Sequence, residues 1–446
     1  MPSSQSSSSP RKGIDRLYHP ALVWIFRLIV GATFVLSGFT KSIDVWGSYY
    51  KIEEYLQVWG WDIPSSLVVL ASFLLGGVEF VCGCLLLLGC YKRVAVWVLT
   101  LMMAFMLPLT LYIVIADPVA DCGCFGDFLI ISNSATFIKN IFLTLFLVYL
   151  LKFNRKVDGL FVPYVQWVIG GLLSLYILIV ALFGYNIQPM IDFRRFDSGT
   201  DLLAAGSGEE GDEAVYDFIY EKDGREESFT IDNLPDSTWT FVDRRLVRGS
   251  ESVTDGFAVI SDGENIAEDI IDPETDQFIV TIPDITKVDL SYTYLLNELN
   301  DYITERGGSM VALVNADEDG IERWRDVSMA SYEIYTAEPT LIKELARGHA
   351  AIVFLHEGVV VWKRTLSSIN YTIVTETPPG EIDSELDPSS GKILQWLTLT
   401  FVAVIVAVMI LDRSGRLVAW LLRRRRRKAA KEASADNPGE DTAPGN

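Results

Sequence analysis

The stretch from Ser65 to Gly89 reads SSLVVLASFLLGGVEFVCGCLLLLG and decides the class of the protein. A transmembrane helix needs about 20 mostly apolar residues, and Glu79 is the only charged residue in this stretch. Five further stretches have a similar character. The sequence therefore predicts six spans, at residues 21–40, 65–89, 94–116, 135–151, 164–185 and 392–411. The fourth is short, which leaves an amphipathic helix open as an alternative there.

Clusters of Lys and Arg predict how the spans run, because loops on the cytoplasmic side are enriched in these residues. The clusters are Arg11, Lys12 and Arg16; Lys92 and Arg93; Lys152, Arg155 and Lys156; and Arg413, Arg416 and the run from Arg423 to Lys428. All four fall on one side if every span crosses the membrane. We therefore expect a multi-pass protein of the bacterial inner membrane, with both termini cytoplasmic and with residues 41–64, 117–133 and 186–391 outside. The first span has no cleavage site after it, so we expect it to be retained.

Composition separates an apolar part of the chain from an acidic part. Half of the 446 residues are hydrophobic, yet the formal net charge is −21. This charge argues against a nucleic-acid partner, because phosphate binding needs clustered cations.

The run from Arg423 to Lys428 indicates a stop-transfer anchor, with binding of anionic lipid headgroups as the alternative. We expect residues 1–20 to be a cytoplasmic N-terminus and residues 412–446 a polybasic, disordered tail.

The region from 186 to 391 reads as two parts. An acidic linker and a small β-rich subdomain are expected at 186–254, and an α/β domain at 255–375. Expected strands are 214–221, 227–231, two within 236–246, and then 257–260, 277–282 and 310–314. Expected helices are 292–306 and 321–327, and a closing hairpin is expected from 351–355 and 359–364.

Residues 255–369 resemble the thioredoxin fold in this order of elements. Members of that family carry Cys-x-x-Cys after the first buried strand, whereas this chain reads Ile282-Pro-Asp-Ile-Thr286 there. Residues 348–350 read Gly-His-Ala where the family has a cis-proline. Without a thiolate there is no nucleophile for disulfide exchange. The resemblance therefore implies a redox-inert domain that binds a client or serves as a scaffold.

Another resemblance rests on short motifs in the first four spans and their loops. The motifs are Arg27-Leu-Ile-Val-Gly31 with Leu36-Ser-Gly-Phe-Thr-Lys41, Val78-Glu79-Phe80, Asp117-Pro-Val-Ala-Asp-Cys-Gly-Cys-Phe-Gly-Asp127, and Ser132-Asn133 with Phe137-Ile-Lys139-Asn140. They resemble the DoxX superfamily and, within it, the MauE-type proteins of methylamine utilisation. The likeness extends to long Bacteroidetes versions, in which a four-helix membrane unit is fused to an external thioredoxin-like domain. It implies a four-helix unit at 21–152, a fifth span leading out at 164–185 and a sixth returning at 392–411.

The same resemblance implies redox chemistry. MauE proteins are associated with forming or carrying disulfides for methylamine dehydrogenase, and DoxX relatives with quinone-linked roles. It therefore implies an oxidoreductase-like carrier of thiol/disulfide equivalents for an extracytoplasmic client, with quinone as the candidate electron partner. A non-enzymatic envelope assembly or scaffold protein is the alternative.

Cys122 and Cys124 are the candidate reactive residues, because their loop is expected outside, where disulfides persist. Gly123 permits the sharp turn of a Cys-x-Cys ring, and such a strained ring is oxidising. A purely structural disulfide or thiol pair is one alternative. A metal site completed by flanking aspartates is another, although the chain has only three histidines to complete it.

Several charged side chains are expected to support the pair. Asp121 and Asp127 disfavour a thiolate, unless Lys41 or Lys139 folds over the loop. Arg27 and Glu79 each cost at least about 2.5 kcal/mol in mid-bilayer unless they are paired. Counting about 1.5 Å per residue puts these two at similar depth, which predicts an Arg27–Glu79 ion pair that either locks two helices or flanks a quinone or proton site. Three further cysteines, at 82, 84 and 90, are expected to pack between helices. The aromatic loop 44–64 is expected to lie in the membrane interface, with a cover over a site shared with the Cys122 loop as the alternative.

Overall fold

The structure is a computed structural model, and it describes residues 19–119, 121–206, 215–222, 225–230, 240–248, 256–261, 264–372 and 385–435. The chain divides into two compact units. The membrane unit comprises Met1–Tyr185, Pro189–Ile191 and Ser389–Asn446, and the second unit comprises Asn186–Gln188 and Asp192–Pro388.

In the described part of the chain, six helices are long and apolar enough to cross a membrane. They are α2 (Pro20–Ile43), α4 (Ser65–Leu88), α5 (Lys92–Ala116), α6 (Asn133–Phe153), α7 (Gln166–Asn186) and α15 (Ser390–Ala435). The six predicted spans are confirmed by length and composition, and the fourth is a full-length helix rather than a short amphipathic one. The protein is therefore a polytopic helical membrane protein.

Helices α2 and α4 approach closely at glycines. A Cβ atom on Gly38 would lie 2.3 Å from the backbone nitrogen of Phe80, and one on Gly83 would lie 2.8 Å from that of Val35. Small residues at such crossings let helix backbones approach in a membrane. The resulting antiparallel register sets Ser37 beside Glu79, whose side chains are hydrogen-bonded.

We expect Gly38→Ala to destabilise the membrane unit by about 1–3 kcal/mol, because the new methyl group meets backbone atoms that cannot rotate away. Gly77→Ala in the same helix pair is the matched control, since a Cβ atom there has no heavy atom within 4 Å. Thermal unfolding of the purified protein in detergent compares the two variants. Equal melting temperatures would contradict the close crossing.

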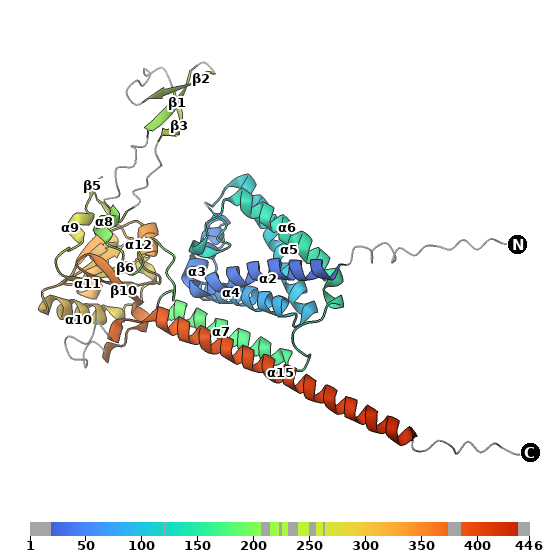
Figure 1. Ribbon diagram of the computed structural model, residues 1–446. Helices are drawn as coiled ribbons and strands as arrows, with labels where there is room; N and C mark the ends of the chain where they lie inside the picture. Colours follow the sequence, from blue (N-terminus) through green and yellow to red (C-terminus); the bar gives the residue numbers. More distant parts are fainter. Residues whose placement is uncertain are drawn as a thin grey trace, which may run out of the picture. The chain divides into compact units, whose positions relative to one another are not determined.

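Helices α7 and α15 lie side by side (Figure 1) and share an aromatic contact. The rings of Tyr176 and Phe401 stack at 4.3 Å, and the Tyr176 hydroxyl lies 3.0 Å from the Thr398 hydroxyl. Helix α15 continues without a break to Ala435. The predicted disorder of the tail from residue 412 is therefore wrong as far as Ala435, because alanines, leucines and long basic residues favour a helix there; residues 436–446 lie outside the described residues.

A five-stranded mixed sheet forms the core of the second unit, in the order β10-β9-β6-β7-β8. The central strand β6 (Asp276–Ile282) pairs parallel with β7 (Ser309–Val314), which pairs parallel with β8 (Glu333–Thr336). On its other side β6 pairs antiparallel with β9 (Ala351–His356), which forms a hairpin with β10 (Val359–Thr365). Both faces are covered, so β6 is buried along nearly its whole length, as its mostly apolar run Phe278–Ile282 predicts.

Helices pack on the two faces of this sheet. Phe278 and Val280 of β6 share a core with Leu296 of α10 (Tyr292–Glu305). Ile279 points the other way and shares a core with Ile342 of α12 (Pro339–Leu345). Shorter helices are α8 (Leu202–Gly206), α9 (Ala267–Ile270) and α11 (Glu318–Ser328).

The predicted elements of this unit are largely confirmed, with several differences. The helix expected at 321–327 begins earlier, at Glu318, because Asp317 caps it by accepting from Gly320 N. The strand expected at 257–260 is wrong; β4 covers only Ile260–Ser261 and pairs with β5 (Glu264–Asn265), while Phe257 and Val259 are core residues. Strand β8 and helix α12 were not predicted from the sequence. The turn at 262–263 lies outside the described residues.

A separate three-stranded sheet has the order β2-β1-β3. It consists of β1 (Val215–Lys222), β2 (Arg225–Thr230) and β3 (Thr240–Arg248), all antiparallel. The first two predicted strands are confirmed. Residues 240–248 form one continuous strand, and the rest of the predicted pair within 236–246 lies outside the described residues.

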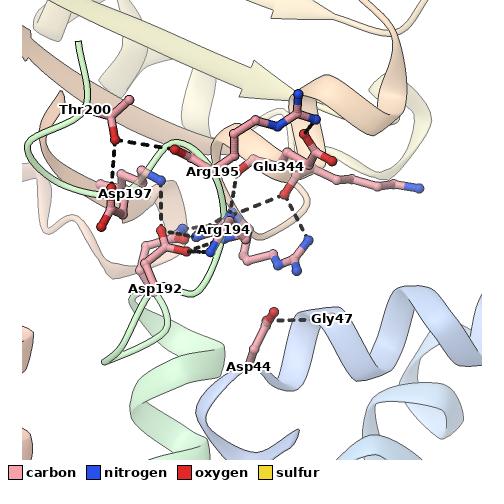
Figure 2. Close-up of polar contacts among 12 residues, drawn as sticks. Asp44, Gly47, Asp192, Arg194, Arg195, Asp197, Thr200 and Glu344 are labelled. Atoms are coloured by element: carbon pink, nitrogen blue, oxygen red, sulfur yellow. Dashed lines mark hydrogen bonds and ion pairs between the residues drawn. The ribbon is translucent and has the colours of Figure 1, made fainter. Parts of the chain in front are cut away.

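Buried ion pairs hold the segment after α7 on the second unit (Figure 2). Asp192 accepts from Arg194 Nε at 2.6 Å and from Lys363 Nζ at 2.8 Å. Burial alone would raise the pKa of Asp192, but Arg194 and Lys363 lower it to about 2. Figure 2 also shows Arg195 paired with Glu344, at 2.6 Å. This segment therefore forms part of the folded second unit rather than a loose linker.

Candidate functional site

Cys122 and Cys124 lie in the loop between α5 and α6. Their sulfur atoms are 2.8 Å apart, and both residues are free cysteines. Gly123 between them has φ +65°, a left-handed conformation that favours glycine. Cys122 is only 7% exposed. The predicted juxtaposition of the two thiols is therefore present, and the pair is shielded by neighbouring helices.

A buried polar cluster holds the Cys124 end of the loop on helices α2 and α4. Lys41 Nζ lies 2.9 Å from Glu79 Oε2, and the Ser37 hydroxyl lies 2.7 Å from the same oxygen. Lys41 Nζ also donates to the carbonyl oxygen of Cys124 at 2.6 Å, and Ser37 Oγ lies 2.6 Å from that oxygen. The ammonium and carboxylate therefore neutralise each other where an isolated charge would be costly.

The predicted Arg27–Glu79 pair is wrong. Glu79 pairs with Lys41, whereas Arg27 donates to the carbonyl oxygens of Asn154 at 2.8 Å and Val157 at 3.0 Å. The antiparallel register explains the error, because Arg27 lies beside Gly89, ten residues along α4 from Glu79. That distance is about 15 Å of helix. Arg27 therefore stabilises the end of α6, away from the cysteine pair.

Electrostatics make the two thiols unequal. The hydrogen bond from Cys122 lowers the pKa of Cys124, and the positive charges of Lys139 and Lys41 lower it further. Burial raises this pKa, but the lowering effects are larger, and the pKa of Cys124 is about 7. The same hydrogen bond and burial raise the pKa of Cys122. Both lysines that the sequence suggested as partners therefore lie near enough to act on the pair. Lys139 Nζ also lies 4.3 Å from the centre of the Phe125 ring.

Helix α3 (Val45–Val58) supplies Lys51, which sequence reasoning missed, and Tyr55, which belongs to the aromatic stretch that was an alternative cover for the cysteine loop. Lys51 Nζ lies 3.2 Å from Asp121 and 2.8 Å from Glu54. The Tyr55 hydroxyl donates to the carbonyl oxygen of Cys122 at 3.3 Å. Residues 44–64 were expected to be an interfacial aromatic loop, yet Lys51 and Tyr55 are four residues apart, which places them on one face of a helix. That spacing was the available signal.

Asp121 is therefore engaged by groups that offset its charge. Its Oδ1 accepts from Gly123 N at 2.7 Å, while Lys51 Nζ donates to Oδ2. Asp127 lines the cavity beside the pair. The flanking aspartates are expected to disfavour a thiolate. Lys51 offsets the charge of Asp121, and Lys41 and Lys139 favour the thiolate of Cys124.

A mostly apolar cavity of about 500 Å³ adjoins both cysteines. Its polar wall includes Lys41, Glu79 and Asp121. Its apolar wall comprises side chains from α3, α4 and α5, namely Ile52, Leu56, Trp59, Leu75, Leu101, Met102, Phe105, Met106 and Leu109. Leu101 is 73% exposed and Phe105 is 64% exposed on α5, so the cavity adjoins the face of that helix available to lipid. This size lies in the range of small-molecule sites.

Two of the other cysteines lie among the packed helices. Cys82 and Cys90 are buried in the helix core, as packing residues are expected to be. Among the described residues, no group of three or more His, Cys, Asp or Glu side chains is placed to hold a metal ion.

We expect Gly123→Ala to expose the cysteine pair. A Cβ atom there would lie 2.8 Å from Lys51 Cγ, so Lys51 must move away from Asp121, and the left-handed backbone costs about 1–2 kcal/mol. Gly126→Ala is the control, because φ is +55° there but nothing lies within 4 Å. The rate at which iodoacetamide labels the loop peptide should rise only in Gly123→Ala. Equal rates in both variants would count against Lys51 as a shield.

Two parts of the chain match known protein-family models. Residues 19–153 match the family model of the methylamine utilisation protein MauE. Residues 214–248, which contain the three-stranded sheet, match a domain of unknown function, DUF8463. No curated protein and no solved structure matches the chain. The protein is therefore a polytopic membrane protein whose first four spans are similar to the methylamine utilisation protein MauE.

Proposed function

We propose that the protein exchanges thiol/disulfide equivalents through Cys122 and Cys124. The observation that carries this proposal is the pair itself, with thiols 2.8 Å apart and the pKa of Cys124 lowered to about 7 beside Lys139 and Lys41. A thiolate is the reactive form in disulfide exchange. A purely structural pair has no need of a lowered pKa or of a cavity that reaches both sulfurs.

The unequal thiols assign a direction to the exchange. In the oxidised protein, a client thiolate attacks the sulfur of Cys122, and Cys124 leaves as the thiolate, because the thiol with the lower pKa leaves faster. A second client thiolate then attacks the mixed disulfide. The client gains a disulfide, and the pair returns to the reduced state with both thiols free.

We further propose a quinone as the electron partner that restores the disulfide. The reduced pair gives up two electrons and two protons, its sulfurs become bonded, and the quinone becomes a hydroquinone. The apolar cavity beside the pair supports this assignment, because its α5 wall adjoins the lipid-facing surface from which a lipid-soluble oxidant arrives. Lys41 and Glu79 lie at its polar wall and can hold or pass a proton.

The client belongs, in this proposal, outside the cytoplasm. The four basic clusters support a cytoplasmic position for both termini and an external position for the cysteine loop and the second unit. The second unit supports a thioredoxin-like binding role through its strand order, in which a parallel strand pair adjoins an antiparallel hairpin. It has no cysteine of its own, so it holds the client without reacting.

The test is to trap free thiols in intact cells with a membrane-impermeant reagent, before and after a reductant. We expect Cys122 and Cys124 to become labelled only after reduction, or to change state when an oxidant is supplied. Labelling that never changes, together with Cys→Ser variants that keep full function, favours a non-enzymatic scaffold instead.

The lowered pKa predicts the pH dependence of labelling. The thiolate of Cys124 forms as pH rises through about 7, so alkylation of the reduced protein should reach half its maximal rate near that pH. An ordinary cysteine reaches it only near pH 8.5. Mass spectrometry of the loop peptide across pH 5–10 measures the midpoint. A midpoint above pH 8 for Cys124 would contradict its activation by Cys122, Lys139 and Lys41.

A further inference from the structure

The last part of α15 presents an unusual combination of exposed apolar and basic side chains. Leu417, Val418, Trp420, Leu421 and Leu422 are each between 44% and 58% exposed, although they follow the residues expected to end the span. Six consecutive basic residues, Arg423 to Lys428, come next on the same unbroken helix. The Arg424 guanidinium lies 5.3 Å from the centre of the Trp420 ring.

The length of the helix places these side chains relative to a bilayer. From Lys392 to Leu422 the helix is about 46 Å long at 1.5 Å per residue. The hydrocarbon core is about 30 Å thick, and the bilayer with its headgroups is about 40–45 Å thick. At the usual tilt of about 20°, this segment crosses the whole bilayer. Trp420 then lies in the headgroup layer and Arg423 at its outer limit.

Contacts near Asp412 support this placement. The Asp412 side chain is fully buried and forms an ion pair with Arg416, whose Nη2 lies 2.7 Å from Asp412 Oδ2. Arg416 Nη2 also donates at 3.1 Å to the carbonyl oxygen of Leu160, which lies in the connection between α6 and α7. Pairing with each other and with a carbonyl oxygen lowers the cost of placing these charged groups in the hydrocarbon near its edge. The turns from Leu417 onward therefore lie among the headgroups.

We propose that residues 417–428 form a binding site for anionic phospholipid headgroups. The basic side chains supply the complementary charge, and clusters of four to eight Lys or Arg beside a span are suited to such lipids. The aromatic and aliphatic side chains at 417–422 supply the apolar contact that a soluble polyanion does not satisfy. This site is independent of the cysteine pair.

The test measures lipid retention by the purified full-length protein with native mass spectrometry. Phosphatidylglycerol and phosphatidylcholine with the same acyl chains are offered at equal concentration. We expect phosphatidylglycerol to be retained at least about tenfold better, since each basic residue contributes about 1 kcal/mol near an anionic surface. The triple variant Arg423→Gln, Arg425→Gln, Arg427→Gln should lose this preference.

Two matched variants keep the test decisive. Replacing the same three arginines with lysine should preserve the preference and shows that charge, not a damaged fold, is responsible. Arg323→Gln with Arg325→Gln removes exposed cations from α11 and should change nothing. Equal retention of both lipids by the wild type, an unchanged preference in the glutamine variant, or displacement by millimolar inorganic phosphate would each overturn the proposal.

Discussion

Cys124→Ser is expected to abolish disulfide exchange with a client. Cys124 carries the thiol whose pKa is lowered to about 7. Its loss removes the leaving group and one of the two sulfurs that form the disulfide. Turnover should fall to background, whereas folding should be preserved because serine is nearly isosteric. Cys82→Ser, at a buried position in the helix core, is the control and should keep its turnover.

Cys122→Ser separates the attack of a client on Cys122 from the reactivity of the Cys124 thiolate. A client attacks Cys122 in the proposed sequence, so its removal also stops turnover, but the serine hydroxyl can still donate a hydrogen bond to Cys124. Cys124 should therefore remain reactive toward iodoacetamide near neutral pH. Turnover that survives in both single variants would contradict a reaction at this pair.

Glu79→Leu is expected to have the largest effect on stability. Lys41 and Glu79 are both buried and 2.9 Å apart, so removal of the carboxylate leaves an ammonium unpaired among helices. Breaking a buried pair in this way costs about 3–5 kcal/mol. Ser72→Ala is the control in the same helix, because Ser72 donates only to the Val68 carbonyl one turn earlier. Thermal unfolding in detergent measures both.

The double variant Lys41→Met, Glu79→Leu tests what the pair does for the cysteines. Removing both charges should restore most of the lost stability, because an apolar replacement of a buried pair is often neutral. The Cys124 carbonyl would still lose its hydrogen bond from Lys41, and the alkylation midpoint should move to higher pH. A stable double variant with an unchanged midpoint would leave the pair a purely structural role.

Much of the membrane architecture could be predicted because it depends on local composition. The apolar stretches identified all six spans, and the fourth left an alternative open only because the stretch at 135–151 is short. The same reasoning identified Cys122 and Cys124 from their spacing around Gly123. It also identified the buried strands of the second unit, where mostly apolar runs mark β6 and β7.

The partners of the charged residues could not be predicted, because they depend on how two helices align. Arg27 and Lys41 lie fourteen residues, or about four turns, apart on α2. The alignment of α2 with α4 decides which of them Glu79 meets, and glycines at 38 and 83 set that alignment through close backbone contact. Strand β8 was missed for another reason. It is a short edge strand that is partly exposed, so its residues Glu333–Thr336 lack a buried pattern.

The most direct test follows the bond between the two sulfurs. The full-length protein is reduced, reconstituted in lipid and treated with a lipid-soluble quinone, and the peptide containing Cys122 and Cys124 is then analysed by mass spectrometry. The account predicts that this peptide loses two hydrogens through an internal disulfide, that hydroquinone forms in equal amount, and that Cys124→Ser shows neither change. A peptide that remains a dithiol under quinone, and also under a disulfide-bonded client, would contradict the proposed function.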